Sequence, residues 1–422
     1  MTPKDIQPAL VVADEQGNIY DDPDLGMLCR RGQEIAPPRP DELIALPDGS
    51  DLFLLPGRQA LGMDPGAGEV VVADGQAVAA FVCPGFTLSA HPAYLTADDA
   101  PTLPLYAYGA VGYARGRFWV CARRVDTDKR QVFSGIPAGA IEQGARELLR
   151  RYPDNRLVRH LTRCALTYCC PAARNLALGR YEAPLPTSRS CNARCIGCIS
   201  RQPDGSGFCA TQQRITFRPS PLEIHQVMHH HAHREKLPIF SFGQGCEGEP
   251  LTEARLIRES VAGYREKGGR GTINLNTNAS LPEWVEPLAR SGLDSIRVSL
   301  NSATRERYLA YYRPEGYSFE DVTASIREAK RHGLFVSLNL LFFPGLTDSE
   351  EELDALCSLA VDTRLDFIQL RNLNLDPELY LDIQPQVTTP CTGLANFIKR
   401  LRKACPWLKF GYFNPYIEEA QS

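Results

Sequence analysis

The sequence lacks the features that would place the chain in a membrane or on a nucleic acid. No block of like charge stands out and the formal net charge is -4, so nothing predicts a nucleic-acid binding surface. Overall charge does not exclude a basic groove formed locally by the fold. Residues 1–12 lack a basic start followed by an apolar core, so no signal peptide is expected. The longest apolar region, residues 334–346, is broken by Ser337, Asn339 and Pro344 and cannot span a bilayer. We therefore expect a cytoplasmic protein with no membrane partner.

The chain is comparatively rich in cysteine. It has 14 cysteines in 422 residues, and without a secretory signal these are expected to be reduced thiols and metal ligands rather than disulfides. Three of them, Cys191, Cys195 and Cys198, form a C-x3-C-x2-C motif just after a short apolar run. Thiolate is the ligand that iron–sulfur clusters take. A loop this short can wrap one cubane and leave one iron without a protein ligand, open to chelation by a small molecule.

The pattern along the chain predicts an α/β protein in four parts. Residues 1–135 have strand-like runs between turns and form a mostly β N-terminal domain of unknown role. Residues 136–182 form a helical linker, residues 183–375 alternate strand and helix, and residues 376–422 are a C-terminal helix and strand extension. Repeated strand–helix units imply parallel strands with right-handed crossovers, hence a full or partial α/β barrel. In such barrels, ligands bind at the C-terminal ends of the strands.

Local signals place several element ends. A hairpin is expected around residues 114–116, and Ser220 and Ser318 are expected to cap helices. Left-handed C-caps are expected at three glycines, Gly268, Gly292 and Gly333. The candidate strands of the α/β part are residues 239–242, 272–275, 295–300, 334–341 and 367–370.

The cysteine motif resembles that of the radical S-adenosylmethionine (SAM) enzymes. Residues 243–250, Gly-Gln-Gly-Cys-Glu-Gly-Glu-Pro, resemble the family's Gly-Gly-Glu-Pro segment, which holds the SAM amino group. The resemblance covers about half of the chain. It implies a partial (β/α)6 TIM-like radical SAM barrel that carries a [4Fe-4S] cluster on Cys191, Cys195 and Cys198. In that family the open iron binds SAM, and reductive cleavage gives a 5'-deoxyadenosyl radical. The cluster is expected to be oxygen-sensitive.

The resemblance also implies a set of SAM contacts. Glu249 and the Gly248 carbonyl would hold the ammonium group, and polar residues at strand ends would hold the ribose and carboxylate. Gly345 lies in a turn that resembles the one against the adenine. The full set of implied cofactor-binding residues is Glu247, Gly248, Glu249, Asn276, Asn278, Ser299, Asn301 and Gly345. One departure is Gly197, where the family often has an aromatic residue before the third cysteine.

Other cysteine and histidine groups have competing interpretations. A zinc site would need a fourth ligand, which Cys209 could supply. Cys164, Cys169 and Cys170 could hold a second cluster, although Cys164 belongs to a helical apolar stripe. Cys246 could act as a radical or covalent residue, and packing is the interpretation we favour. Five histidines crowd one segment with i,i+4 spacings, and a solvated helix face is favoured over a metal site; they are His225, His229, His230, His231 and His233.

The resemblance leaves the substrate open. The first hypothesis is an enzyme that modifies a small molecule or peptide, with a one-electron donor such as flavodoxin or ferredoxin. The second is a tRNA- or nucleotide-modifying radical SAM enzyme. A third is a non-catalytic iron–sulfur or zinc binding module. Release of 5'-deoxyadenosine would separate a catalyst from a structural module.

Overall fold

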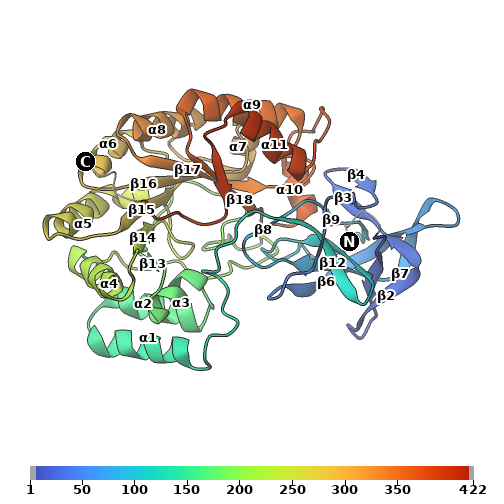
Figure 1. The fold of residues 1–422 in the computed structure, drawn as a ribbon, viewed down its shortest axis with the longest axis horizontal. Helices are drawn as coiled ribbons and strands as arrows, with labels where there is room; N and C mark the ends of the chain where they lie inside the picture. The colour runs from blue at the N-terminus through green and yellow to red at the C-terminus, as the bar shows by residue number, and fades with distance from the viewer. Residues whose placement is uncertain (1–5, 418–422) are drawn as a thin grey trace.

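A computed structural model describes residues 6–417 of the chain. It has an N-terminal β part, three linking helices and an α/β part, which Figure 1 shows in blue to cyan, in green, and in yellow to red. None of the helices described is long and apolar enough to cross a bilayer.

The N-terminal part consists of antiparallel strands. A nine-stranded sheet has the order β10-β6-β2-β1-β7-β11-β12-β5 with β8 paired to β12, and a small sheet has the order β4-β3-β9. The β11–β12 hairpin turns at Arg115 and Gly116, which both have positive φ, as the sequence predicts. The strands are β1 (Ala9–Ala13), β2 (Ile19–Met27), β3 (Cys29–Arg31), β4 (Glu34–Ala36), β5 (Leu43–Ala45), β6 (Asp51–Asp64), β7 (Glu69–Phe81), β8 (Phe86–Leu88), β9 (His91–Pro92), β10 (Tyr94–Thr96), β11 (Gly109–Ala114) and β12 (Arg117–Arg124).

Three helices follow: α1 (Ala140–Arg151), α2 (Arg156–Leu166) and α3 (Pro171–Leu178). The apolar stripe of α2 is buried at Leu157, Leu161 and Cys164, because that face packs on the α/β part. Asn155 caps the helix by accepting from the Val158 amide. The same side chain donates to a backbone carbonyl of the helix that follows β13, so the linker is fixed to the next domain.

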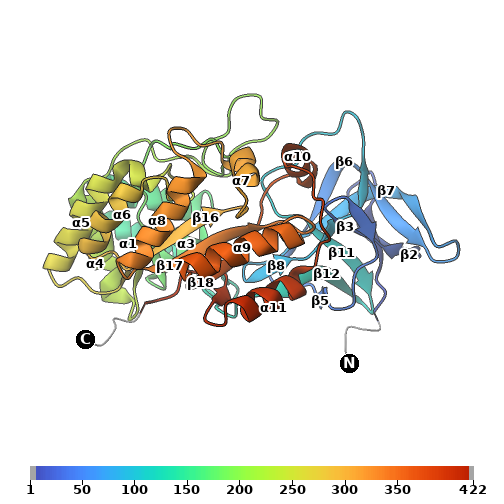
Figure 2. The same cartoon turned by 90° about the horizontal axis from the view of Figure 1, so that it is seen from above.

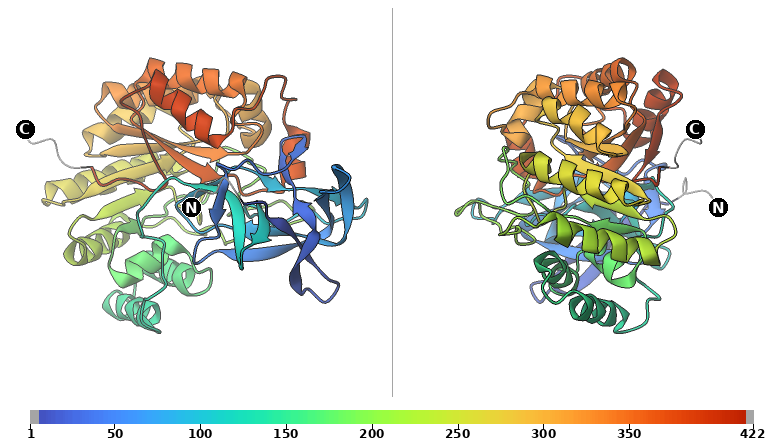
Figure 3. Two further views of the ribbon diagram at one scale, coloured as in Figure 1. Left: turned by 45° about the vertical axis from the view of Figure 1, so that its right-hand side comes forward. Right: turned by 90° about the vertical axis from the view of Figure 1, so that its left-hand side faces the viewer.

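The α/β part is built on one parallel sheet of seven strands in chain order. The strands are β13 (Glu182–Pro184), β14 (Ile239–Phe242), β15 (Thr272–Thr277), β16 (Ser295–Leu300), β17 (Phe335–Phe342), β18 (Phe367–Asn372) and β19 (Lys409–Gly411). Because neighbouring strands are consecutive and crossovers are right-handed, the connecting helices come to the same face. Figure 3 shows them outside the curved sheet. This arrangement confirms the partial barrel. The seventh strand, β19, lies in the C-terminal part, where the sequence predicts a helix and a strand, and it forms one edge of this sheet.

The helices of this part are α4 (Pro221–Arg234), η2 (Pro250–Glu253), α5 (Ala254–Glu266), η3 (Pro282–Trp284), α6 (Val285–Arg290), α7 (Arg305–Tyr312), α8 (Phe319–Arg331), α9 (Glu350–Thr363), α10 (Pro377–Ile383) and α11 (Leu394–Ala404). Ser220 and Ser318 cap α4 and α8 with complete capping boxes. The three predicted C-cap glycines follow α5, α6 and α8 with φ values of 71°, 101° and 74°. Helix boundaries therefore follow from local cap chemistry.

Side chains bridge the seam between the two edge strands of the sheet. Asn414, just after β19, donates to Glu182 on β13 at 2.9 Å. Arg130 donates to the Asn414 carbonyl at 2.8 Å and lies 3.8 Å from the Glu182 carboxylate. The residues before α1 thus help to close the barrel where the backbone ladder ends.

The N-terminal part sits against the ends of β17 and β18 and against α10, as Figure 2 shows from above. Leu88 donates its amide to Asn372 at 2.8 Å, and Arg58 forms a buried ion pair with Asp376 at 2.9 Å. The two parts therefore meet through specific polar contacts next to the C-terminal ends of the strands, where the architecture places a ligand.

Candidate functional site

The cysteine loop begins directly after β13 and is held by the C-terminal end of α7. The amides of Arg194 and Ile196 donate to the carbonyls of Tyr312 and Tyr311, and the Glu315 amide donates to Asn192. Cys191, Cys195 and Cys198 are each half-buried. All three line one cavity of about 450 Å³. The structure thus brings the three predicted ligands together in the lining of this cavity.

The spacing of the three sulfurs fits a cluster better than a single metal ion. The three sulfurs of the loop cysteines do not all lie within 4.8 Å of one another, whereas the ligand atoms of some other groups among residues 6–417 do. A single tetrahedral zinc with ligands at 2.3 Å would require sulfurs about 3.8 Å apart. A cubane binds each thiolate through a different iron and so needs wider spacing. Cys209, which could have supplied the fourth ligand of a zinc site, is exposed and lines a neighbouring hollow instead. The donor set therefore fits a [4Fe-4S] cluster.

The protonation of the thiols follows from their burial. Burial raises the pKa of Cys191 to about 11 and raises that of Cys195 well above its usual range. Both are protonated thiols in the metal-free chain near neutral pH, and cluster ligation must release these protons. Arg214 donates to the Cys198 sulfur at 3.6 Å.

Glu247 organises the loop that faces the cysteines. Its buried carboxylate accepts from the amides of Thr187, Ser188, Gly243 and Gln244 at 2.7–2.9 Å. Thr187 also donates its hydroxyl. With five donors the carboxylate is saturated, so Glu247 fixes the loop after β14 to the strand end that leads to the cysteine motif. Glu247 lines the cavity, but its carboxylate has no acceptor site left for a ligand.

Gly248 and Glu249 lie where the two loops touch. A Cβ on Gly248 would come 1.9 Å from the Ser190 carbonyl oxygen, so only glycine permits this approach. Glu249 is 4% exposed, and its carboxylate accepts from the amides of Leu251 and Asn278 and from the Thr277 hydroxyl. Burial raises its pKa to about 7. A cationic ligand group would favour the ionised form.

The predicted polar strand ends divide into those at the cavity and those away from it. Asn276, Asn278 and Ser299 line a hollow of about 160 Å³ that also includes Cys191 and Glu249. Asn276 donates to the carbonyls of Phe242 and Gly243, and Asn278 donates to Asn192. No hydrogen bond engages the Ser299 hydroxyl within the described part of the chain, which leaves it available to a ligand.

Two residues of the predicted set lie outside both hollows. Asn301 is fully buried and donates to the Arg307 carbonyl and to the Tyr380 hydroxyl. Gly345 packs against the β3–β4 turn, where its Cβ position is 2.1 Å from the Gly32 nitrogen. Both residues therefore serve packing in this structure, Gly345 at the contact with the N-terminal part.

The cavity also contains residues that the sequence did not indicate. Tyr311 lies against Gly197, where a Cβ would be 2.6 Å from its hydroxyl oxygen, so an aromatic ring from α7 occupies the place next to the third cysteine. Arg297 lines the same cavity, together with Arg371 at the end of β18. Arg297 is two residues before Ser299 on β16, and this spacing puts both on one face of the strand. That alternation could have identified Arg297.

The histidines of α4 do not form a metal site, and two are buried rather than solvated. His231 is fully buried and its Nε2 pairs with the Tyr181 carbonyl, while His230 packs edge-on against Tyr152. The solvated-face interpretation was therefore wrong for these two, because α4 is covered by the linker and by β13.

The three linker cysteines are not gathered around one centre. Cys169 is exposed, whereas Cys164 is buried beside Cys246, which comes from the loop after β14. Cys246 is buried outside the cluster cavity, which fits packing better than a radical role. Cys170 lines the cavity wall.

The chain was compared with known proteins. Residues 185–357 match the family described as the Radical SAM superfamily, which supports the [4Fe-4S] cluster and SAM expected from the loop. A GTP 3',8-cyclase of Thermodesulfovibrio yellowstonii is 28% identical over 193 residues, 42% of this chain and 52% of that protein. A probable GTP 3',8-cyclase of Thermococcus kodakarensis is 30% identical over 167 residues, 39% of this chain and 48% of that protein. The chain spans about half the length of these curated relatives.

The chain was also compared with solved structures. SuiB of Streptococcus suis bound to S-adenosylmethionine aligns with a TM-score of 0.38 and 12% identity, over 75% of this chain and 72% of that one.

Proposed function

Because residues 185–357 form a domain of the radical SAM superfamily, we propose that this protein is a radical SAM enzyme that acts on an anionic small molecule or peptide. The observation that carries the proposal is the convergence of three thiols and the polar ends of β15 and β16 on one cavity. When bound, the cluster and SAM supply a one-electron reductive cleavage that yields a 5'-deoxyadenosyl radical able to abstract hydrogen from a C–H bond.

The chain's own residues would bind and orient SAM. Glu249 and the Gly248 carbonyl would accept from the ammonium group, because a buried carboxylate next to a cation is stabilised in its ionised form. Ser299, Asn276 and Asn278 would take the ribose and carboxylate, with Ser299 as the free hydroxyl. Glu247 would position the loop rather than bind the ligand.

The charge of the cavity supports an anionic substrate. The Arg297 guanidinium donates to Gln369 at 3.1 Å, and its buried Nε has no partner among residues 6–417. Burial, and then the neighbouring Arg371, lower the pKa of Arg297 to about 10. An anion such as a carboxylate or phosphate would relieve this repulsion and pair with the guanidinium groups. An electron donor such as flavodoxin or ferredoxin, and a location in the cytoplasm, belong to the same proposal.

A nucleotide is the second candidate substrate. The relatives are named GTP 3',8-cyclases, and paired arginines suit a phosphate group. With GTP as the probe, Arg371→Gln is expected to weaken binding at least about tenfold through the lost charge-assisted contact. If GTP does not bind the wild-type protein, the nucleotide candidate fails while the SAM proposal stands.

The enzyme proposal is tested by anaerobic reconstitution with iron and sulfide, followed by SAM and dithionite. The wild type should show a cluster absorption band and release 5'-deoxyadenosine. Cys191→Ala, Cys195→Ala and Cys198→Ala should each lose both, whereas Cys357→Ala on α9, a half-buried thiol away from the site, should keep both. A normal band in all three loop variants would overturn the ligand assignment, and a cluster without 5'-deoxyadenosine would indicate a non-catalytic module.

A further inference from the structure

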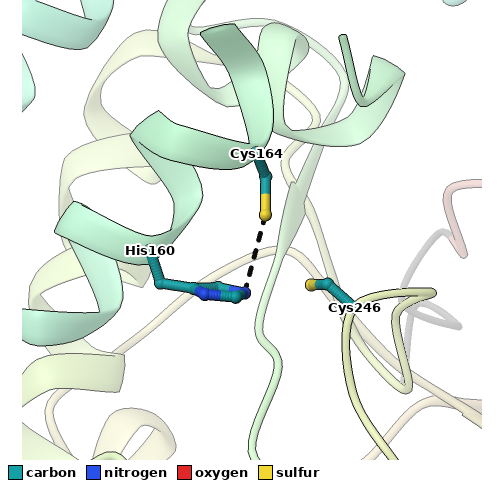
Figure 4. Close-up of side chains that lie close together, drawn as sticks. All are labelled: His160, Cys164 and Cys246. Atoms are coloured by element: carbon teal, nitrogen blue, oxygen red, sulfur yellow. Dashed lines mark hydrogen bonds between the residues drawn. The ribbon is translucent and has the colours of Figure 1, made fainter. Parts of the chain in front are cut away.

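A second group of soft ligand side chains lies beside the cluster cavity. His160 and Cys164 are four residues apart on α2, so they share one face of the helix, and Cys246 approaches from the loop after β14. Their ligand atoms all lie within 4.8 Å of one another. The Cys164 sulfur is 3.5 Å from His160 Nε2. Figure 4 shows the two thiols and the ring converging on one point.

We propose that His160, Cys164 and Cys246 bind one soft divalent cation of the Zn²⁺ class, with water in the fourth position. Two thiolates and an imidazole are a ligand set that zinc takes in proteins, and three protein ligands with an open fourth position are an established arrangement. Both sulfurs would bind the ion as thiolates, and any proton that they carry in the metal-free pair would go to solvent, with no change of oxidation state.

The surroundings suit such a site. Cys164 and Cys246 are 1% and 3% exposed, and they pack with Ala165 and Ala173 in a small apolar cluster. A dry shell strengthens metal–thiolate bonds and limits exchange. His160 is half-buried, which leaves a path from solvent. The two groups differ in spacing, since the ligand atoms of His160, Cys164 and Cys246 are close enough together for one ion and those of the loop cysteines are not.

The position of Cys246 indicates what the ion would do. Its neighbours Gly245 and Glu247 both line the cluster cavity, and its carbonyl accepts from the Ile215 amide at 2.7 Å. A metal at this point would tie α2 to the loop that carries Gly248 and Glu249. The ion would act as a clamp on that loop, and its presence does not depend on the proposed SAM chemistry.

The test is zinc-edge X-ray absorption on the full-length, cluster-loaded protein supplied with zinc. Iron absorbs at a different edge, so the cluster does not contribute. We expect about one zinc ion per chain, with two sulfur neighbours at about 2.3 Å and one nitrogen at about 2.0 Å. Cys164→Ser and Cys246→Ser should lose the ion and His160→Ala should bind it at least about tenfold more weakly, whereas Cys357→Ser should retain it.

Two further measurements separate loss of the zinc site from misfolding of a variant, and zinc bound at this site from zinc bound by the loop cysteines. Zinc should raise the melting temperature of the wild type and a chelator should reverse the rise, which requires no variant. A variant with Cys191, Cys195 and Cys198 all replaced by alanine should still bind the ion. Zinc content unchanged by the Cys164 and Cys246 substitutions, an oxygen-only shell, or a Cys164–Cys246 disulfide in protein that takes up no zinc would each overturn the proposal.

Discussion

The close approach of Gly248 to the cysteine loop makes a demanding prediction. In Gly248→Ala, the new Cβ would meet the Ser190 carbonyl oxygen at 1.9 Å and the carbonyl carbon at 2.4 Å, whereas real Cβ contacts essentially never fall under 3.0 Å. Both atoms belong to the backbone immediately before Cys191, so no side-chain rotation can relieve the clash. The two loops must therefore separate by about 1 Å, and a shift of that size at a reacting site can lower the rate roughly a hundredfold.

The iron content of the reconstituted protein and its cleavage of SAM both test for that displacement. After anaerobic reconstitution, Gly248→Ala should retain most of its fold but lose most of its iron, and the release of 5'-deoxyadenosine should fall about a hundredfold. Overpacking should lower the free energy of unfolding by about 1–3 kcal/mol. Gly26→Ala is the matched control, because its Cβ would meet Met63 at an ordinary 3.5 Å. Wild-type iron content and wild-type cleavage in Gly248→Ala would refute the reasoning.

Two further predictions concern stability. Arg58→Met leaves the Asp376 carboxylate buried without its cation, which should cost about 3–5 kcal/mol in chemical denaturation. An Arg58→Met, Asp376→Asn double variant removes the orphaned charge but keeps an oxygen that can accept from the Leu103 or the Glu378 amide, so it should recover part of the loss. Equal losses in both variants would contradict the ion-pair account. Burial lowers the pKa of His91 to about 4 from 6.5. The folded state therefore favours the neutral ring, and the contribution of this preference to folding stability, present above pH 6.5, is lost as the pH falls toward 4. Unfolding free energy should drop by about 2 kcal/mol between pH 7 and pH 5 from this residue, and a His91→Gln variant should lack that part of the drop.

The local features of the chain could be predicted from the sequence. The capping serines, the C-cap glycines, the β11–β12 hairpin and the alternation of strand and helix each depend on residues close together in the chain. The cysteine loop belongs to the same class, because its spacing is itself the signal. The placement of Asn276 and Ser299 at strand ends followed from the rule that parallel strands present their C-terminal ends to a ligand.

The partners of individual side chains could not be predicted. Nothing in the pattern around Glu247 shows that its carboxylate binds Thr187 and Ser188, sixty positions earlier in the chain. The buried state of His231 depends on which elements cover α4, and periodicity over a single helix does not report this. Asn301 and Gly345 have the residue types expected at a ligand, yet the packing of α10 and of the β3–β4 turn takes them away from the cavity.

The three-thiol loop and the parallel strand–helix array around it could be recognised in the chain alone, because motif spacing, cap chemistry and hydrophobic period depend on neighbouring residues. The fold was needed to show that Arg297 and Tyr311 share a cavity with those thiols, and that Cys246 meets His160 and Cys164. Such contacts join segments distant in the chain, and their geometry is set by how whole elements pack rather than by any local preference.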